Sequence, residues 1–224
     1  MNLARSAGLV FGKELRIELR THDLTHTVLF FVLMVAGLFS FAFDPSSTES
    51  RVILPGLIWI AFFFAGTLML QLCFVREQVN DTLAALRLAP IDPFAILLGK
   101  ILANFGFLAV TEIVFVPVFS LFYNVSLGGV LGRLMLLLFL GTFGLAVPGT
   151  VFSAMTAQAR MRELLLPLLL LPVLAPVLIA GVEATAALLG PGHALEREWV
   201  VMLAGFDLIF LTATWLLAGF LVEE

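Results

Sequence analysis

Two acidic residues stand within apolar stretches of this sequence, where a carboxyl group has few possible roles. Glu112 lies in one such stretch and Asp207 in another. A carboxylate near the centre of a bilayer is costly, so such residues usually face the interior of a helix bundle or mark a transport pathway. For each residue we consider two interpretations, a functional role and a structural role in hydrogen bonding or ion pairing.

Glu112 has two stable forms in such a place. It is either protonated or paired with a cation. Arg133, in the next apolar stretch, is the best candidate for that cation because its long side chain can reach along a bundle. An ion pair that forms in one state and separates in another predicts that Glu112→Gln impairs function, since Arg133 loses its partner. A permanently protonated acid predicts that the same substitution is tolerated.

The longest polar segment of the chain is Arg76–Lys100. Its pattern predicts a short amphipathic helix with one apolar edge at i, i+4, i+7 spacing, formed by Val79, Leu83 and Leu86. A short helix of this kind between two membrane spans suits docking to a soluble partner. The alternative is an ordinary polar loop.

Capping and proline residues mark the ends of this helix. Asn80 or Asp81 can accept hydrogen bonds from the free backbone N–H groups of its first turn. Pro90 ends it, and Asp92-Pro93 predicts the start of a further helix. The candidate coupling residues, within the segment 76–93, are Arg76, Glu77, Asp81, Thr82, Leu83, Leu86 and Arg87.

No motif for ATP hydrolysis or metal-assisted hydrolysis is present. The Gly-Lys pairs ending at Lys13 and Lys100 lack the earlier glycine and the following Ser or Thr of a phosphate-binding loop. His22 and His26 have i, i+4 spacing but no third ligand nearby, so we interpret them as polar residues at the end of a span. His193 stands alone. We therefore expect a chain that is not an enzyme and holds no metal.

The composition is that of a membrane protein. Of the 224 residues, 61% are hydrophobic and 12% are charged, and each bilayer-spanning helix needs about 20 mainly apolar residues. We predict an all-α integral membrane protein that forms a single transmembrane domain over residues 1–224. The six predicted spans are 24–43, 52–75, 94–122, 127–156, 164–189 and 199–221.

Glycine and proline residues distinguish two of these spans. In span four Pro148 predicts a kink, and three glycines allow a neighbouring helix to approach closely. Span five carries three prolines, which indicate either a bent helix in a moving part or prolines that a membrane bundle tolerates. The glycines are Gly141, Gly144 and Gly149, and the prolines are Pro167, Pro172 and Pro176.

Residues 2–20 predict an interfacial amphipathic helix. Four basic side chains, Arg5, Lys13, Arg16 and Arg20, fall within about one quarter of the helical wheel, opposite an apolar face. Glu14 and Glu18 interrupt that apolar face, which makes them candidates for contacts with protein instead of lipid. A basic face beside an apolar face fits a helix in the headgroup region. The alternative is a soluble cytoplasmic arm.

The placement of basic residues predicts the orientation. With the N-terminus inside, only Arg51, Arg133 and Arg197 of the 12 Lys and Arg residues lie outside. The positive-inside rule therefore predicts that both termini and the polar segment 76–100 are cytoplasmic.

Four segments make the sequence recognisable. The most specific are TLAALRLAPIDPFAILLGK (82–100) and RELLLPLLLLP (162–172). With PGLIWIAFFFAGTLMLQ (55–71) and VTEIVFVPVFSLFYNVSL (110–127), they closely resemble the CcmB family, the membrane permeases of the haem exporter in cytochrome c maturation. The resemblance covers essentially the whole chain in order. One departure is Asp81, where many relatives have glycine.

The resemblance implies a six-span permease of the ABC-exporter type in the bacterial inner membrane. It implies two copies of this chain, two copies of an ATPase subunit that binds ATP and Mg, a multispan haem-handling subunit, a small single-span subunit and a periplasmic haem chaperone. Membrane lipid is a further partner, and nucleic acid is not. ATP hydrolysis by the partner is then linked to release of the haem-loaded chaperone.

The resemblance also places the haem ligands on the companion subunit. The three tryptophans here are scattered singly and form no tryptophan-rich haem motif, so we expect no cofactor bound by this chain and identify no haem-binding residue. Two other functions stay open. One is an ABC permease that exports a lipid or polysaccharide, and the other is a non-conducting membrane scaffold.

Overall fold

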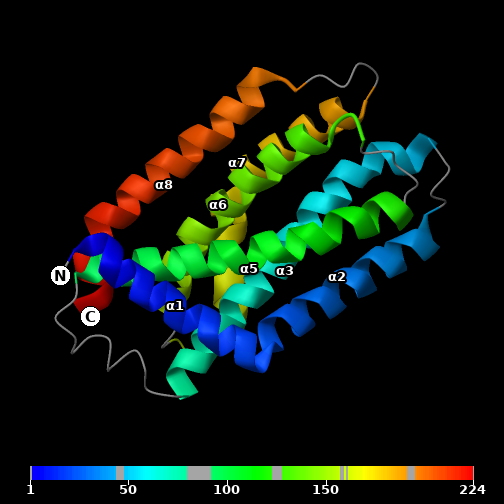
Figure 1. Ribbon diagram of the computed structural model, residues 1–224. Helices are drawn as coiled ribbons and strands as arrows, with labels where there is room; N and C mark the ends of the chain where they lie inside the picture. Colours follow the sequence, from blue (N-terminus) through cyan, green and yellow to red (C-terminus); the bar gives the residue numbers. More distant parts are fainter. Residues whose placement is uncertain are drawn as a thin grey trace.

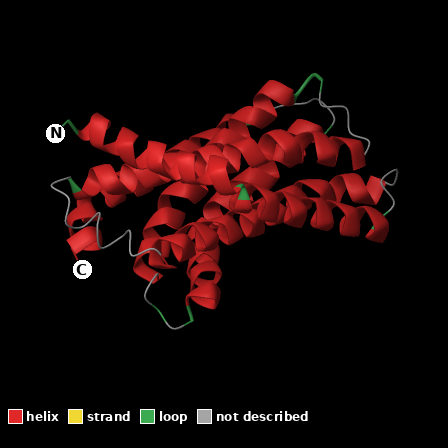
Figure 2. Ribbon diagram, turned by 60° about the horizontal axis from the view of Figure 1, so that its bottom comes forward, coloured by secondary structure: helices red, strands yellow, loops and turns green. Residues whose placement is uncertain are grey.

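The structure, a computed structural model, describes residues 2–43, 48–79, 92–122, 128–156, 159, 161–190 and 195–223. Every regular element in these ranges is a helix (Figure 2). In chain order the helices are α1 (Leu3–Thr21), α2 (Asp23–Ala42), α3 (Thr48–Val79), α5 (Pro93–Phe122), α6 (Leu131–Thr156), α7 (Arg162–Leu189) and α8 (Arg197–Glu223).

All the described helices except α1 are long and apolar enough to cross a membrane, which makes six candidate spans. Their bounds agree with the six predicted spans to within about four residues at each end, and the largest differences are at α3 and at the start of α6. The predicted all-α membrane fold is therefore confirmed. The protein is a multi-pass membrane protein.

The bundle has a centre and two flanks. Two-thirds of the residues in the membrane windows of α3 and α6 are buried, against 22% in those of α2 and α8. Both chain termini lie at one end of the bundle, and α1 crosses that end, close to where α2 begins and α3 finishes (Figure 1). The positions of α2 and α8 leave most of their surface available to lipid.

Close packing at the centre depends on glycines that face large side chains. A Cβ added at Gly141 would lie 2.4 Å from the ring of Trp59, and one added at Gly149 would lie 2.4 Å from Leu70. Trp59 is fully buried, and its indole N–H donates a hydrogen bond to Thr185 Oγ1 at 2.9 Å. The prediction that glycines of span four permit close approach is confirmed, with α3 approaching at Gly141 and Gly149 and with α7 and α8 approaching at Gly144.

The start of α5 follows the predicted capping pattern. Asp92 Oδ1 accepts a hydrogen bond from the backbone N–H of Phe94 at 2.8 Å, and Pro93 is the first helical residue. Carboxylates are preferred at this position because they satisfy a free N–H group of the first turn.

The polar segment is shorter in the structure than the sequence indicated. Its first residues continue α3 as far as Val79, and its last eight belong to α5. Lys100 is only 3% exposed, so the end of the predicted polar segment lies inside the bundle and not in a polar loop. The reason is that Ala95, Ile96 and Leu97, which precede Lys100 on α5, are buried, so this turn of the helix lies inside the bundle.

Helix α1 turns its acidic residues toward the bundle. Glu14 Oε1 lies 3.0 Å from Lys13 Nζ and 3.6 Å from Lys100 Nζ on α5. Glu18 Oε1 accepts hydrogen bonds from the backbone N–H and the hydroxyl of Thr25 at 2.8 and 2.7 Å. Both acids contact protein, as their positions on the wheel indicated.

Part of the apolar face of α1 packs against protein. Val10 is 3% exposed and packs against α5 at Gly99, while Leu3 and Leu15 of the same face stay 38% and 36% exposed. His22 then adopts a left-handed conformation, with φ of 56°, and turns the chain from α1 into α2.

Candidate functional site

A polar seam runs along the contact between α5 and α6 inside the apolar bundle. Thr142 Oγ1 is hydrogen-bonded to Glu112 Oε1, and the amide nitrogen of Asn104 donates a hydrogen bond to Thr150 Oγ1 at 2.9 Å. All four residues are at most 7% exposed. The seam therefore joins two helices by polar contacts that lipid cannot reach.

The register of this seam follows from helix geometry. Asn104 and Glu112 are eight residues apart on α5, and Thr142 and Thr150 are eight apart on α6. Eight residues are close to two helical turns, so each pair lies on one face of its helix. Because the two helices run antiparallel, residue 104 meets residue 150 and residue 112 meets residue 142.

The hydrogen bonds around Thr142 favour a protonated Glu112. Thr142 Oγ1 is also 2.7 Å from the backbone oxygen of Leu138, which can only accept. A hydroxyl group carries a single hydrogen, so an ionised Glu112 would leave Thr142 with two acceptors and one proton. A protonated Glu112 satisfies both contacts, because it donates to Thr142 while Thr142 donates to Leu138.

This structure does not contain the predicted ion pair between Glu112 and Arg133. Among the described residues, Thr142 is the hydrogen-bond partner of Glu112. Arg133 is exposed and lies nine residues from Thr142 along α6, which is roughly 13 Å at 1.5 Å per residue. The two side chains are therefore at different depths.

Asp207 approaches the opposite side of α6. It is 7% exposed, and a Cβ added at Gly144 would lie 2.9 Å from its Oδ1, so the glycine makes room for the carboxyl group. Thr142 and Gly144 are two residues apart, about 200° around α6 and 3 Å along it. Glu112 and Asp207 thus approach α6 from opposite sides, at about the same height along the helix. Within the described part of the chain, Asp207 Oδ1 has no hydrogen-bond partner.

The candidate coupling residues are not brought together by the described part of the structure. Arg76 and Glu77 belong to the last turn of α3, and their side chains are not described. Asp81, Thr82, Leu83, Leu86 and Arg87 lie outside the described residues. The interpretation of this segment as a docking helix therefore stays a prediction.

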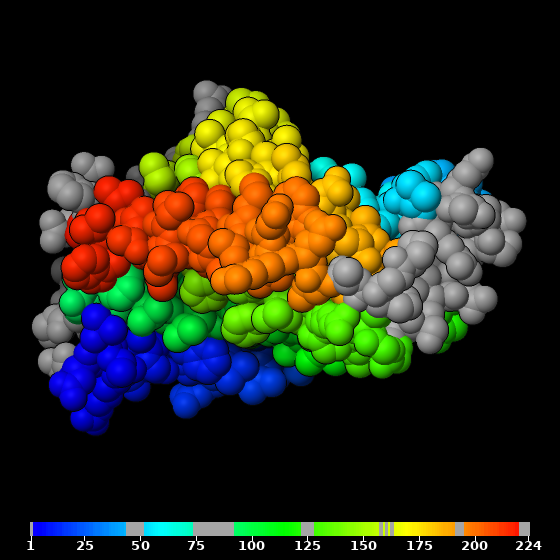
Figure 3. Space-filling model, turned by 90° about the horizontal axis from the view of Figure 1, so that it is seen from above, coloured from blue at the N-terminus to red at the C-terminus, as the bar shows by residue number. Residues whose placement is uncertain are grey.

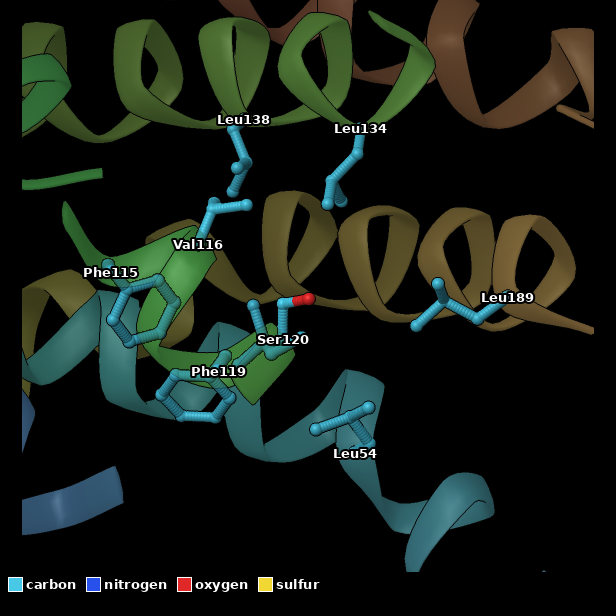
Figure 4. A pocket seen from close by; sticks show the side chains of 9 residues that line it. Leu54, Phe115, Val116, Phe119, Ser120, Leu134, Leu138 and Leu189 are labelled. Carbon is cyan, nitrogen blue, oxygen red and sulfur yellow. The ribbon is translucent and has the colours of Figure 1, made fainter. Parts of the chain in front are cut away.

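An apolar pocket lies among α3, α5, α6 and α7, with Leu54, Phe119 and Leu138 in its wall and Ser120 as its single polar lining residue (Figure 4). Its volume is about 20 Å³, which is room for about one water molecule. The pocket is far too small to hold a haem group. Among the described residues no three His, Cys, Asp or Glu side chains are placed to bind a metal ion.

Sequence comparison assigns the chain to a family. Residues 5–222 match the family described as CcmB protein. The chain belongs to this family. It is 33% identical to the Heme exporter protein B of Pseudomonas aeruginosa over 211 residues, which are 92% of this chain and 89% of that relative. It is 30% identical to that of Rhodobacter capsulatus over 174 residues, 78% of this chain and 79% of the relative.

Sequence reasoning found Glu112 and Asp207 but missed Asn104 and the two threonines of the seam. The available signal was the repeated eight-residue spacing of polar residues in consecutive spans, 104 and 112, then 142 and 150. This spacing in antiparallel neighbours predicts paired polar contacts.

The single hydrogen of the Thr142 hydroxyl group leads to a testable prediction about Glu112. Glu112→Gln retains a hydrogen-bond donor of similar shape, so we expect normal yield and an unchanged unfolding temperature in detergent. Glu112→Leu removes the donor and leaves Thr142 Oγ1 with an unused acceptor in an apolar site, which costs about 1–3 kcal/mol. If Glu112→Gln is as destabilised as Glu112→Leu, the carboxyl is needed in its charged form.

Proposed function

We propose that this chain is the membrane subunit of a haem exporter in the bacterial inner membrane. The observation that carries the proposal is its similarity to Heme exporter protein B of Pseudomonas aeruginosa over 92% of its length. Six candidate spans with one helix across the end of the bundle suit a permease. The protein is then one part of an assembly that delivers haem for cytochrome c maturation.

The energy source in this proposal is a separate ATPase subunit. The sequence has no phosphate-binding loop, so ATP and Mg bind to the partner, of which two copies pair with two copies of this chain. Helix α3 ends and α5 begins at the end of the bundle that α1 crosses, and the segment 80–91 lies between them in the sequence. Docking of the ATPase to this segment would transmit its motion to the spans.

The remaining partners follow from the same proposal. A multispan haem-handling subunit and a small single-span subunit complete the complex, and ATP hydrolysis releases a haem-loaded periplasmic chaperone from it. Haem is handled by the assembly and is not a resident cofactor of this chain. The distribution of basic residues supports a cytoplasmic location for both termini.

Purification of the native complex tests this function. The expected result is co-purification of an ATPase and a haem-handling subunit, with release of the haem-loaded chaperone when ATP and Mg are added. A non-hydrolysable ATP analogue should hold the chaperone in place. Export of a lipid or polysaccharide by an otherwise similar complex, with no haem-handling chain present, would contradict the proposal.

Leu83→Asp is expected to uncouple the ATPase. If Leu83 lies on the apolar edge of the docking helix, its burial contributes roughly 1.5–3 kcal/mol, and a charge there weakens ATPase binding by about tenfold or more. The chain should still insert, because position 83 is outside the spans. The measurements are co-purification of the ATPase and cytochrome c maturation in cells.

Leu88→Asp is the matched control. Residue 88 lies about 140° from residue 83 on a helical wheel, on the side away from the apolar edge. The same charge there should leave the ATPase bound. Equal loss of ATPase with both variants would mean that the segment does not dock through one helical face.

A further inference from the structure

Helix α1 separates its charges by face. Its two acids, Glu14 and Glu18, are 7% and 4% exposed and have partners inside the protein. Arg5, Arg16 and Arg20 are all exposed and fall within about 60° of one another on the wheel at 100° per residue. The outward face of α1 therefore carries positive charge with no acid among its exposed residues.

Three contacts fix the rotation of α1 so that this face points outward. A Cβ at Gly99 would lie 2.7 Å from the backbone oxygen of Ala7, so α1 lies directly on α5. Lys100 pairs with Glu14 at 3.6 Å, and Thr25 donates two hydrogen bonds to Glu18. The arginines cannot turn toward the bundle without breaking these contacts.

The outward face also carries apolar side chains. Leu9 and Leu19 are 59% and 63% exposed, beside the arginines. Figure 3 shows this blue helix along the edge of the molecule, next to green α5, and Figure 1 shows it across the end of the spans. A helix face that carries both leucine and arginine suits the boundary between acyl chains and headgroups.

We propose that the outward face of α1 is a binding surface for acidic phospholipids, with Arg5, Arg16 and Arg20 on the headgroup phosphates and Leu9 and Leu19 toward the acyl chains. Guanidinium groups bind phosphate oxygens through paired N–H donors. Arg16 and Arg20 are one turn apart, about 6 Å along the helix, so they can share one headgroup. The surface is independent of the haem-export function.

The expected size of the preference for anionic lipid follows from the number of arginines. A Lys or Arg near an anionic surface strengthens attachment by about fivefold. Each arginine removed should therefore reduce the preference for anionic over zwitterionic lipid by about fivefold. The double variant Arg16→Gln/Arg20→Gln should lose it by about 25-fold, or entirely where the initial preference is smaller.

The test places a fluorophore on α1 of the full chain in vesicles. A cysteine at Gly8, where an added Cβ meets no atom within 4 Å, is labelled in a Cys73→Ser background. Quenching by brominated phosphatidylglycerol is compared with quenching by brominated phosphatidylcholine. We expect stronger quenching by the anionic lipid, a loss with Arg16→Gln/Arg20→Gln, and no change with the control Arg197→Gln on exposed α8.

Three outcomes would overturn the proposal. Equal quenching by the two lipids means that no anionic headgroup is recognised. Suppression of the preference by millimolar inorganic phosphate assigns the arginines to a free anion. An unchanged lipid preference in the double variant, together with loss of a co-purifying ATPase, assigns the face to a soluble protein. An unfolding temperature equal to that of the parent chain shows that each variant is folded.

Discussion

Gly181→Ala is expected to lower the unfolding temperature of the purified chain, because an added Cβ at this position meets the indole ring of Trp59. That Cβ would lie 2.3 Å from Cε2 of the ring. The ring cannot move away, since a Cβ built at Gly141 of α6 would also lie only 2.4 Å from it and its N–H is bonded to Thr185. Overpacking of this kind costs about 1–3 kcal/mol, and more where rigid groups collide, as they do here.

Two further variants make the expectation specific. Gly205→Ala adds the same methyl group to α8 at a position with no atom within 4 Å, so its unfolding temperature should match the parent. Trp59→Phe shortens the ring and should recover part of the loss in the Gly181→Ala background. If Gly181→Ala and Gly205→Ala unfold at the same temperature, α3 and α7 are not in contact through this tryptophan.

The spans were predictable because bilayer thickness sets the length of each apolar run. Hydropathy alone placed all six to within about four residues, and the Asp92-Pro93 pair marked the start of α5 by local chemistry. The glycines of span four also predicted close packing, because small residues let the backbones of neighbouring membrane helices approach. What the sequence did not contain was the partner of each glycine, which depends on how the helices are arranged.

The interior polar contacts were harder to predict for the same reason. Sequence position gives the depth of Glu112 in the membrane but not the direction in which its side chain points. Arg133 was chosen as its partner by charge and reach, whereas the structure places Thr142 beside it and Arg133 on the surface. Lys100 was assigned to a polar segment by its charge, although the buried residues just before it determine its place.

Glu14→Lys is expected to detach α1 from α5. Glu14 and Lys100 are an ion pair within the protein, with side chains 8% and 4% exposed. Breaking such a buried pair costs about 3–5 kcal/mol, and the substituted side chain would lie beside both Lys13 and Lys100. A cysteine at Ser6, a position only 1% exposed, reports the result in a Cys73→Ser background. It should react slowly with a water-soluble maleimide in the parent and rapidly in the Glu14→Lys variant.

The charge-swapped chain separates the ion pair from a general effect of substitution. Glu14→Lys/Lys100→Glu keeps opposite charges at the two positions, so α1 should pack again and labelling at position 6 should slow. Glu198→Lys makes the same change of charge at an exposed site on α8 and should leave labelling unchanged. Slow labelling in the Glu14→Lys chain would show that the packing of Val10 against Gly99 holds α1 in place without the ion pair.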